Sequence, residues 1–238
     1  MDKRTDLKQL KTLLSSQLLD DQVLQRPQGV STGIQQLDEF LFWKGFPRNG
    51  LSLIQGPIGL GATSFWIRAA QSITLAQGWT AWINIKDSSQ CILNPGPLFQ
   101  QQVDLSRLLV VDAPSDSKKV FFALQELLSC ELFELVGCDL TAVKLPRYQV
   151  ERLQRLSRKH KTAAVFINNK RSFLSPQLFS LMIQLQPKKI TVSRALYRPT
   201  PYSIRRIEYA NFMSQLTQGM QSLSSGGVSK IQSMRTVS

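Results

Sequence analysis

The apolar residues of the chain are arranged in short continuous runs separated by stretches with helical spacing. Continuous apolar runs, typical of buried strands, lie at residues 51–54, 79–85, 108–111, 133–138 and 163–167. Between them, apolar residues recur three and four positions apart, which predicts amphipathic helices. Strands that alternate with helices in this way favour an α/β fold, with a mostly parallel central sheet and helices on both faces.

The pattern changes after Pro176. Short strand-like runs at residues 181–185, 190–192 and 204–207 follow one another without an intervening helix. Consecutive short strands joined by turns pair in antiparallel fashion. The sequence therefore predicts an antiparallel extension at the C-terminal edge of the sheet.

The two ends of the chain differ from the middle. Residues 1–28 carry Leu7, Leu10, Leu14, Leu18 and Val23 at helical spacing, which predicts an amphipathic helical segment and a linker. Residues 29–209 form the predicted core. Residues 210–238 are rich in Ser, Gly and Gln, which predicts a partly disordered tail. The tail residues expected to bind a partner are Phe212, Met213, Leu216 and Met220.

Composition excludes several classes of protein. No apolar run is long enough to span a membrane, and the charged N-terminus does not resemble a signal peptide. The three cysteines lack the spacing of a metal site, so we expect no metal centre and a reducing, cytoplasmic environment. No nucleophile–base pair or paired carboxylates stand out, so no other enzymatic activity is expected.

The formal net charge of +13 is distributed unevenly. Residues 144–206 contain a single acid, Glu151, whereas residues 112–139 are rich in Asp and Glu. This asymmetry favours a polyanion or an acidic protein as partner, although a merely solvated surface would look the same. The candidate residues for such contacts are Arg147, Arg152, Arg155, Lys159, Lys170, Arg171, Arg194, Arg198, Arg205 and Arg206.

A glycine-rich stretch at residues 56–64 lies between a predicted strand and a predicted helix. Gly56 and Gly61 have the spacing of a phosphate-binding loop, and Thr63 occupies the position of its hydroxyl residue. The lysine of that motif is missing, because Ala62 stands in its place. The stretch keeps the backbone of a phosphate cradle and lacks its cation.

Several motifs in series resemble the core of the RecA recombinase. They are Thr32-Gly33 followed by Leu37-Asp38, then Gly45-Phe46-Pro47, then the glycine-rich loop, and the similarity extends to about residue 207. The resemblance implies a RecA-like P-loop core. It matches Asp139 to the magnesium-binding aspartate, Asn169 to the glutamine that senses the γ-phosphate, and Lys86 to the catalytic glutamate.

The residues at these positions predict an inactive ATPase. Phosphoryl transfer needs a cation on the β- and γ-phosphates and a group that orients the attacking water. Ala62 carries no charge, and Lys86 cannot act as a carboxylate base. We therefore expect a pseudo-ATPase with no cofactor.

Residual binding of ATP and Mg²⁺ stays open, because backbone N–H groups at the start of the helix could still hold an anion. Lys86 could supply the missing charge from the opposite wall. The alternative is that the glycine-rich loop is only a structural turn and binds no nucleotide. The residues of this nucleotide-binding remnant are Gly56, Gly59, Gly61, Thr63, Ser64, Lys86, Asp139 and Asn169.

Short loops after the fourth and fifth predicted strands, together with the altered motifs, resemble the ImuA family. Similar local runs are residues 103–111, Leu145-Pro146-Arg147 and residues 152–156. The resemblance implies a non-catalytic adaptor in error-prone translesion DNA synthesis and SOS mutagenesis. Its implied partners are an ImuB-like polymerase-fold protein, RecA, indirectly an error-prone replicative-type polymerase, and single-stranded DNA.

Three alternatives remain open from the sequence. The first is an ATP-binding or weakly hydrolysing switch related to RecA paralogues, acting in recombination and repair. The second is a SulA-like inhibitor of cell division that binds a protein. The third is a DNA-binding module with no adaptor role.

Overall fold

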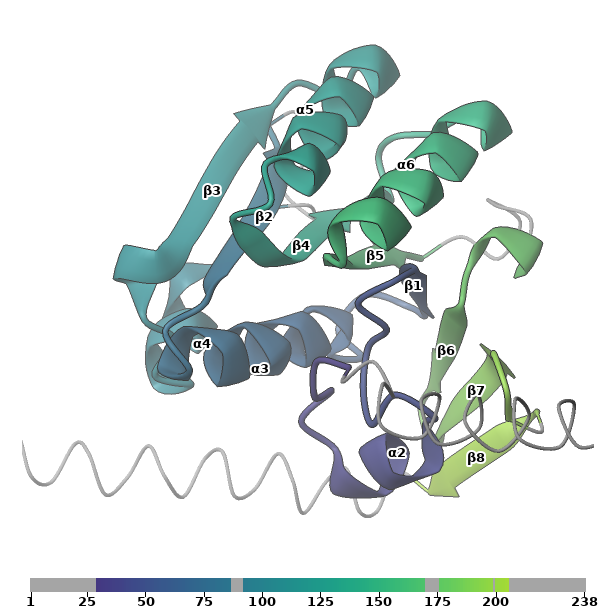
Figure 1. Cartoon of the computed structure of the whole chain (residues 1–238). Coiled ribbons are helices and arrows are strands. Elements are labelled where there is room, and N and C mark those ends of the chain that lie inside the picture. Colours follow the sequence, from purple (N-terminus) through teal and green to yellow (C-terminus); the bar gives the residue numbers. More distant parts are fainter. Residues whose placement is uncertain (1–28, 87–91, 170–175, 199, 206–238) are drawn as a thin grey trace, which may run out of the picture.

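The computed structural model describes residues 29–86, 92–169, 176–198 and 200–205 (Figure 1). The predicted helical segment at residues 1–28, the tail at 210–238 and the cations Lys170, Arg171 and Arg206 lie outside the described residues. Within the described part, no helix is both long and apolar enough to cross a membrane.

The described residues form an eight-stranded sheet in the order β3-β2-β4-β5-β1-β6-β7-β8. The strands are β1 (Leu51–Gln55), β2 (Trp79–Ile85), β3 (Leu108–Ala113), β4 (Phe133–Asp139), β5 (Ala163–Asn168), β6 (Leu181–Gln186), β7 (Lys189–Ala195) and β8 (Tyr202–Arg205). Strands β3 to β6 in this order pair in parallel, whereas β6–β7 and β7–β8 pair antiparallel. The predicted α/β fold and its antiparallel C-terminal edge are confirmed.

Helices cover both faces of the sheet. Helices α3 (Ala62–Leu75) and α4 (Pro95–Gln100) lie on one face, and α5 (Ser117–Ser129) and α6 (Arg147–His160) lie on the other (Figure 1). The short helix α2 (Gln35–Phe40) lies beside the antiparallel end of the sheet, and two 3-10 turns, η2 (Leu105–Arg107) and η3 (Pro176–Leu178), precede β3 and β6.

The core consists of two apolar layers, one on each side of the sheet. In the layer under α3, Trp66 and Trp82 meet edge to face with ring centroids 4.8 Å apart. In the layer under α5 and α6, Phe166 from β5 meets Phe179 in the same manner. Central strands such as β1 and β5 are buried along their whole length, which explains why they consist of continuous apolar runs.

The prediction of a buried strand at residues 108–111 is wrong in one respect. These residues do form β3, but β3 is one of the two edge strands and pairs with β2 alone. Leu109 and Val110 are therefore 41% and 42% exposed. A continuous apolar run does not distinguish a central strand from an edge strand.

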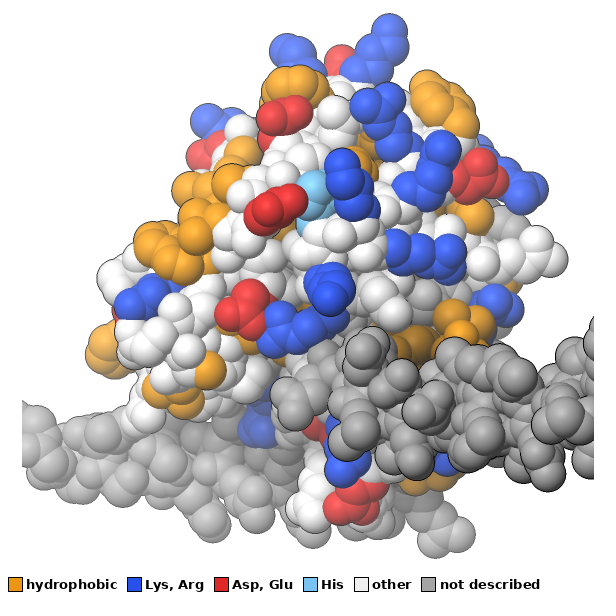
Figure 2. Space-filling model, viewed as in Figure 1, with side chains coloured by type: hydrophobic (Ala, Val, Ile, Leu, Met, Phe, Trp, Pro, Cys, Tyr) orange, Lys and Arg blue, Asp and Glu red, His pale blue; other side chains and the backbone are white. Residues whose placement is uncertain are grey.

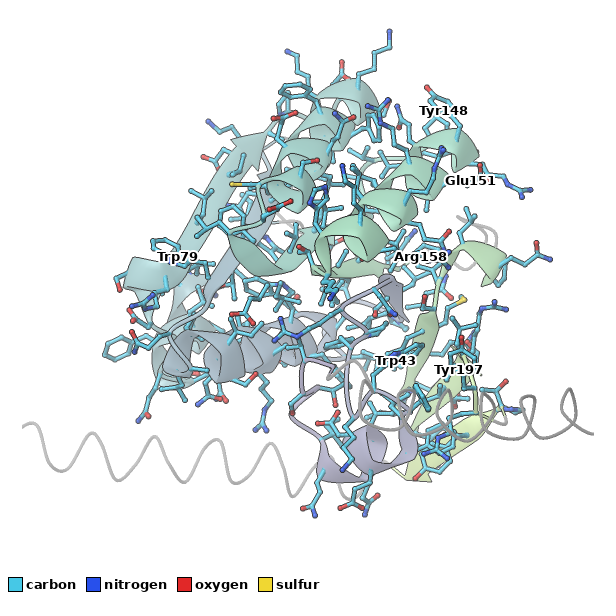
Figure 3. The ribbon with its side chains drawn as sticks, viewed as in Figure 1. Trp43, Trp79, Tyr148, Glu151, Arg158 and Tyr197 are labelled. Carbon is cyan, nitrogen blue, oxygen red and sulfur yellow. The ribbon has the colours of Figure 1, made fainter. Side chains whose placement is uncertain are left out.

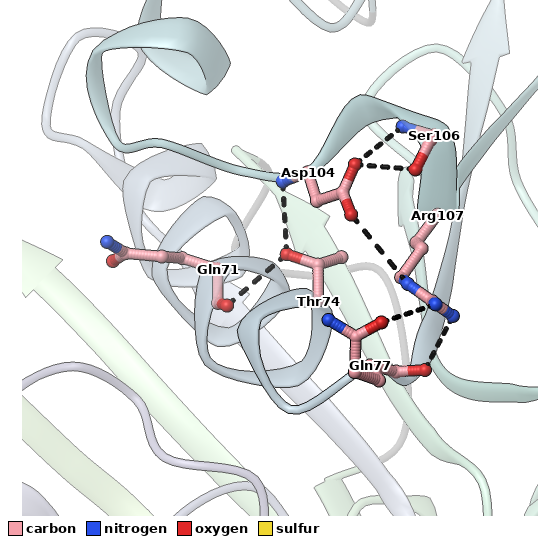
Figure 4. Close-up of polar contacts among 6 residues, drawn as sticks. All are labelled: Gln71, Thr74, Gln77, Asp104, Ser106 and Arg107. Atoms are coloured by element: carbon pink, nitrogen blue, oxygen red, sulfur yellow. Dashed lines mark hydrogen bonds and ion pairs between the residues drawn. The ribbon is translucent and has the colours of Figure 1, made fainter.

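A polar cluster fixes the entry to β3 against the end of α3 (Figure 4). The Arg107 guanidinium donates to the backbone and side-chain oxygens of Gln77, and its Nε lies 3.7 Å from the Asp104 carboxylate. The N–H of Asp104 donates to Thr74 Oγ1 at 3.2 Å. Because these groups satisfy one another, we assign the cluster a structural role.

Candidate functional site

The glycine-rich loop joins β1 to α3 and turns tightly. Gly59 and Gly61 have φ angles of 84° and 80°, in the left-handed region that other residues avoid. The N–H of Ser64 donates to the Gly61 carbonyl at 3.1 Å, and α3 begins at Ala62. The loop thus presents the amino-terminal end of a helix at the carboxyl edge of the sheet, as the motif predicts.

Gly56 allows the loop to lie directly against β6. Its N–H donates to the Asn168 carbonyl on β5 at 3.3 Å. A Cβ added at Gly56 would lie 2.7 Å from Leu185 Cβ and 3.0 Å from the Leu185 carbonyl oxygen. Position 56 therefore has no room for a side chain.

The other positions matched to a nucleotide site lie at the same edge of the sheet. Lys86 directly follows β2, Asp139 ends β4 and Asn169 directly follows β5. These strands and β1 are successive neighbours in the order β2-β4-β5-β1, and they run parallel. Ligands of open α/β sheets bind beyond the carboxyl ends of the strands, at the point where the strand order reverses.

Asp139 is well positioned and largely enclosed, with 8% of its surface exposed. Its Oδ1 accepts a hydrogen bond from the N–H of Thr141 at 2.8 Å, and Thr141 Oγ1 accepts one from the N–H of Asn169 at 3.3 Å. The ends of β4 and β5 are thereby held together. The carboxylate could face an ion beyond this edge, as the magnesium match implies.

Lys86 points away from the loop. Its side chain is 64% exposed, and its Nζ lies 3.6 Å from Asp112 Oδ2 on β3. Asn84 Nδ2 also donates to the Asp112 carboxylate, at 3.1 Å. Because β4 and β5 separate β2 from β1, the structure places Lys86 with the outer strand, and not opposite the loop.

A pocket of about 120 Å³ lies between the loop and the ends of β5 and β6. It is lined by Gln55, Gly56, Pro57, Asn169, Gln184, Leu185 and Gln186, none of which is charged. The buried Oδ1 of Asn169 has no hydrogen-bond partner among the described residues. Carboxamides can donate and accept hydrogen bonds, but they cannot neutralise phosphate charge. Among the described residues, this pocket therefore offers no positive charge to a polyphosphate.

Sequence reasoning missed two of these carboxamides, Gln184 and Gln186. Both lie at the end of β6, which pairs with β1 although the two strands are far apart in the chain. The alternation of apolar and polar residues at positions 183–186 predicts a strand, but it does not predict which strand lies beside it. The missed residues belong to the site only because of the strand order.

The tip of the loop is apolar. Ile58 is 61% exposed, and it follows Pro57 and precedes Leu60 after a single glycine. Such residues do not interact favourably with a nucleotide phosphate. The Ile58 side chain is accessible to a protein partner.

The Thr32–Asp38 motif proves to be internal scaffolding. The Asp38 carboxylate accepts hydrogen bonds from Ser31 Oγ at 2.6 Å and from the N–H and Oγ1 of Thr32. Burial raises the pKa of Asp38 above its ordinary value, against these hydrogen bonds, which lower it. Arg68 of α3 donates to the Gly33 carbonyl at 3.0 Å, so the motif anchors the α2 segment to α3.

Lys and Arg side chains gather over α6 (Figure 2). The buried face of α6 consists of Gln149, Val150, Leu153 and Ser157. The opposite face exposes Arg152, Arg155 and Lys159, as the helical spacing predicts, together with Tyr148, which sequence reasoning missed. Figure 3 shows Tyr148 projecting from the first turn of α6 away from the sheet.

The structure separates the basic candidates by their partners. Arg147 forms an ion pair with Glu151 at 2.7 Å, and Arg194 Nε donates to the Phe179 carbonyl at 2.7 Å. These two guanidinium groups already have partners within the protein. Arg198 is exposed beside Tyr197. Arg205 lies in β8.

An aromatic cluster joins the turn after α2 to the connection between β7 and β8. Tyr197, which is 75% exposed, has its ring centroid 5.1 Å from that of Phe42 and 5.9 Å from that of Trp43 (Figure 3). Phe40 stacks on Tyr202 of β8 with centroids 3.8 Å apart. These contacts hold α2 on the antiparallel edge, so Tyr197 and Tyr202 have a structural role.

Comparison with known proteins adds no assignment to this picture. No protein-family model matches the chain, and no curated protein matches it significantly. The functional interpretation therefore depends on the residues and geometry of the site itself.

Proposed function

We propose that the chain is a RecA-like, non-catalytic adaptor in error-prone translesion DNA synthesis and SOS mutagenesis. The proposal is supported by the loop between β1 and α3 and by the positions matched to it at the ends of β2, β4 and β5. It is further supported by the series of sequence motifs that resemble RecA and ImuA.

The observation that carries the non-catalytic part is the absence of a cation from the described part of the phosphate site. Ala62 occupies the first turn of α3, the lining of the neighbouring pocket is uncharged, and Lys86 pairs with Asp112. In phosphoryl transfer, catalysis is almost entirely positioning and electrostatic stabilisation. Removing one well-placed donor of this kind costs a factor of about 10²–10³ in rate. Two such losses leave no effective ATPase.

The adaptor part concerns protein partners. An ImuB-like polymerase-fold protein and RecA are the proposed direct partners, and an error-prone replicative-type polymerase is reached indirectly. The exposed Ile58 side chain at the tip of the loop offers one apolar point of contact to such a partner. Because the described part of the site lacks the groups for turnover, the adaptor would act by binding alone.

ATP turnover tests the non-catalytic part. We expect the purified chain to release phosphate from ATP no faster than its Asp139→Ala variant, with or without Mg²⁺ and single-stranded DNA. Circular dichroism of both proteins controls for folding. Turnover that disappears in Asp139→Ala would contradict the proposal and favour an ATP-driven switch related to RecA paralogues.

Co-purification tests the adaptor part. We expect the full chain to retain an ImuB-type protein, and Ile58→Asp to weaken that retention by removing an apolar contact. Leu75→Asp, an exposed apolar residue at the end of α3, is the matched control. Equal retention by all three proteins would show that the loop tip is not part of the interface. Failure of the unmodified chain to retain the partner would contradict the adaptor role.

A further inference from the structure

Four exposed residues of α6 lie on one line along the helix. Tyr148, Arg152, Arg155 and Lys159 are separated by four, three and four positions, so they share one face. We call this set the α6 stripe. Val150 and Leu153 lie on the opposite, buried face. Tyr148 is 66% exposed, and the three cations are exposed as well.

The charges of the α6 stripe are not compensated within the described part of the chain. Glu151, the acid of α6, pairs with Arg147. Glu131, which lies between α5 and β4, contacts His160 Nδ1 at 2.8 Å. Among the described residues, neither Arg152, Arg155 nor Lys159 forms a side-chain ion pair. The stripe therefore offers its positive charge to an external anion.

Tyr148 adds an aromatic face to these cations. Its hydroxyl accepts a long hydrogen bond, 3.4 Å, from Gln149 Nε2, which leaves the ring itself exposed. An exposed aromatic ring beside a row of cations is the arrangement with which proteins bind single-stranded nucleic acid. The cations contact phosphates, and the ring stacks on a base.

We propose that the α6 stripe binds single-stranded DNA, with Arg152, Arg155 and Lys159 on successive phosphates and Tyr148 stacked on a base. From Arg152 to Lys159 the helix rises about 10 Å, at 1.5 Å per residue, which gives an extended strand several points of contact. A duplex would satisfy the cations but not Tyr148, because its bases already stack on one another. This inference gives a location to the single-stranded DNA contact that the resemblance implies, and it does not require the protein contacts of the proposed function.

The phosphate contacts are tested by fluorescence anisotropy of a labelled oligothymidylate with the full chain across a salt series. Three phosphate contacts predict a slope of log K against log salt of about −2, at about −0.7 per contact. Arg152→Gln with Arg155→Gln should reduce that slope by about 1.4. Lys118→Gln with Lys119→Gln removes the same charge from α5 and should leave the slope unchanged.

The base contact is tested with a second oligomer of abasic deoxyribose phosphate. Tyr148→Ala should weaken binding of oligothymidylate about fivefold or more, and Tyr148→Phe should preserve it. Neither variant should alter binding of the abasic oligomer. Circular dichroism and thermal unfolding show whether each variant is folded.

The proposal is overturned by undetectable binding, by equal slope changes in the α5 control, or by an equal effect of Tyr148→Ala on both oligomers. Tighter binding of a duplex of the same length, or of polyglutamate, overturns it as well. None of these outcomes depends on ATP or on a polymerase-like partner. Failure of the α6 stripe is therefore distinguishable from failure of the proposed function.

Discussion

Gly137 lies in β4 with the two buried tryptophans directly above it. A Cβ added there would come within 2.5 Å of both Trp66 Cδ1 and Trp82 Cε3. Both indole rings are fully enclosed, so neither can move aside without displacing its own neighbours. The glycine thus lets the two large rings fill the layer between α3 and the sheet.

We expect Gly137→Ala to lower the free energy of unfolding by about 1–3 kcal/mol, the usual cost of overpacking a core. Urea unfolding followed by tryptophan fluorescence measures the change. Gly96→Ala is the control, because a Cβ at Gly96 would meet only the side-chain oxygen of Asn94, at 3.3 Å. A similar loss in both variants would mean that the tryptophan contact is not its cause.

At the scale of single residues, sequence reasoning located the loop but not its surroundings. Gly56 and Asp139 lie at the carboxyl edge because each adjoins or ends a run that could be recognised as a strand. The direction of the Lys86 side chain depends on Asp112, which lies on a strand paired with β2. Such a partner cannot be predicted until the strand order is known.

Among the elements, α5 shows how a cap contributes to stability. The Asp116 carboxylate accepts hydrogen bonds from the N–H groups of Lys118 and Lys119 at the start of the helix. These bonds hold the pKa of Asp116 below its ordinary value of 3.8. Because the folded-state pKa is lowered, the cap stabilises the protein above pH 3.8, and this stability is lost as the pH falls through the folded-state pKa.

We therefore expect the wild-type protein to lose stability relative to Asp116→Asn when the pH is lowered from about 5 to about 2. Asparagine caps a helix nearly as well as aspartate but does not titrate in this range. Thermal unfolding of both proteins at several pH values measures the difference. A constant difference across this range would show that Asp116 contributes no pH-dependent stability.

Whether a segment forms a helix or a strand could be predicted from the spacing of its apolar residues. Whether that helix or strand is buried or exposed could not. The three cations of the α6 stripe could be placed on one face because helical spacing does so whatever surrounds the helix, although Tyr148 was missed. The exposure of β3 could not, since apolar runs at residues 108–111 and 133–138 look alike and only one of them lies at the edge. Whether a strand lies at the edge or in the centre of the sheet is decided by the order in which the strands pair.

For the whole molecule, the alternation of strands and helices predicted the parallel sheet, and the late strands predicted its antiparallel edge. The order of the strands required information that no local pattern contains. Strand β1 lies between β5 and β6, both of which are distant in the chain. The carboxamide pocket exists only because of that insertion.

We expect a chain that ends at residue 175 to lose cooperative unfolding, because it retains β1 to β5 but exposes the β6 side of β1. The deletion also removes Ile183 and Leu185 from the layer under α3. A chain that ends at residue 209 keeps the predicted core and serves as the control. Thermal unfolding measured by circular dichroism compares the two. A sharp transition in the shorter chain would contradict this expectation.

The central position of β1 has a consequence for the order of events during synthesis. Its residues are made well before those of β5 and β6, so neither neighbouring strand exists until residues 163–168 and 181–186 have been made. Contacts between such distant segments form slowly, and unpaired strands in unfinished chains tend to aggregate. While residues 56–162 are being made, the apolar strand that carries the glycine-rich loop is therefore a nascent segment without its partner strands.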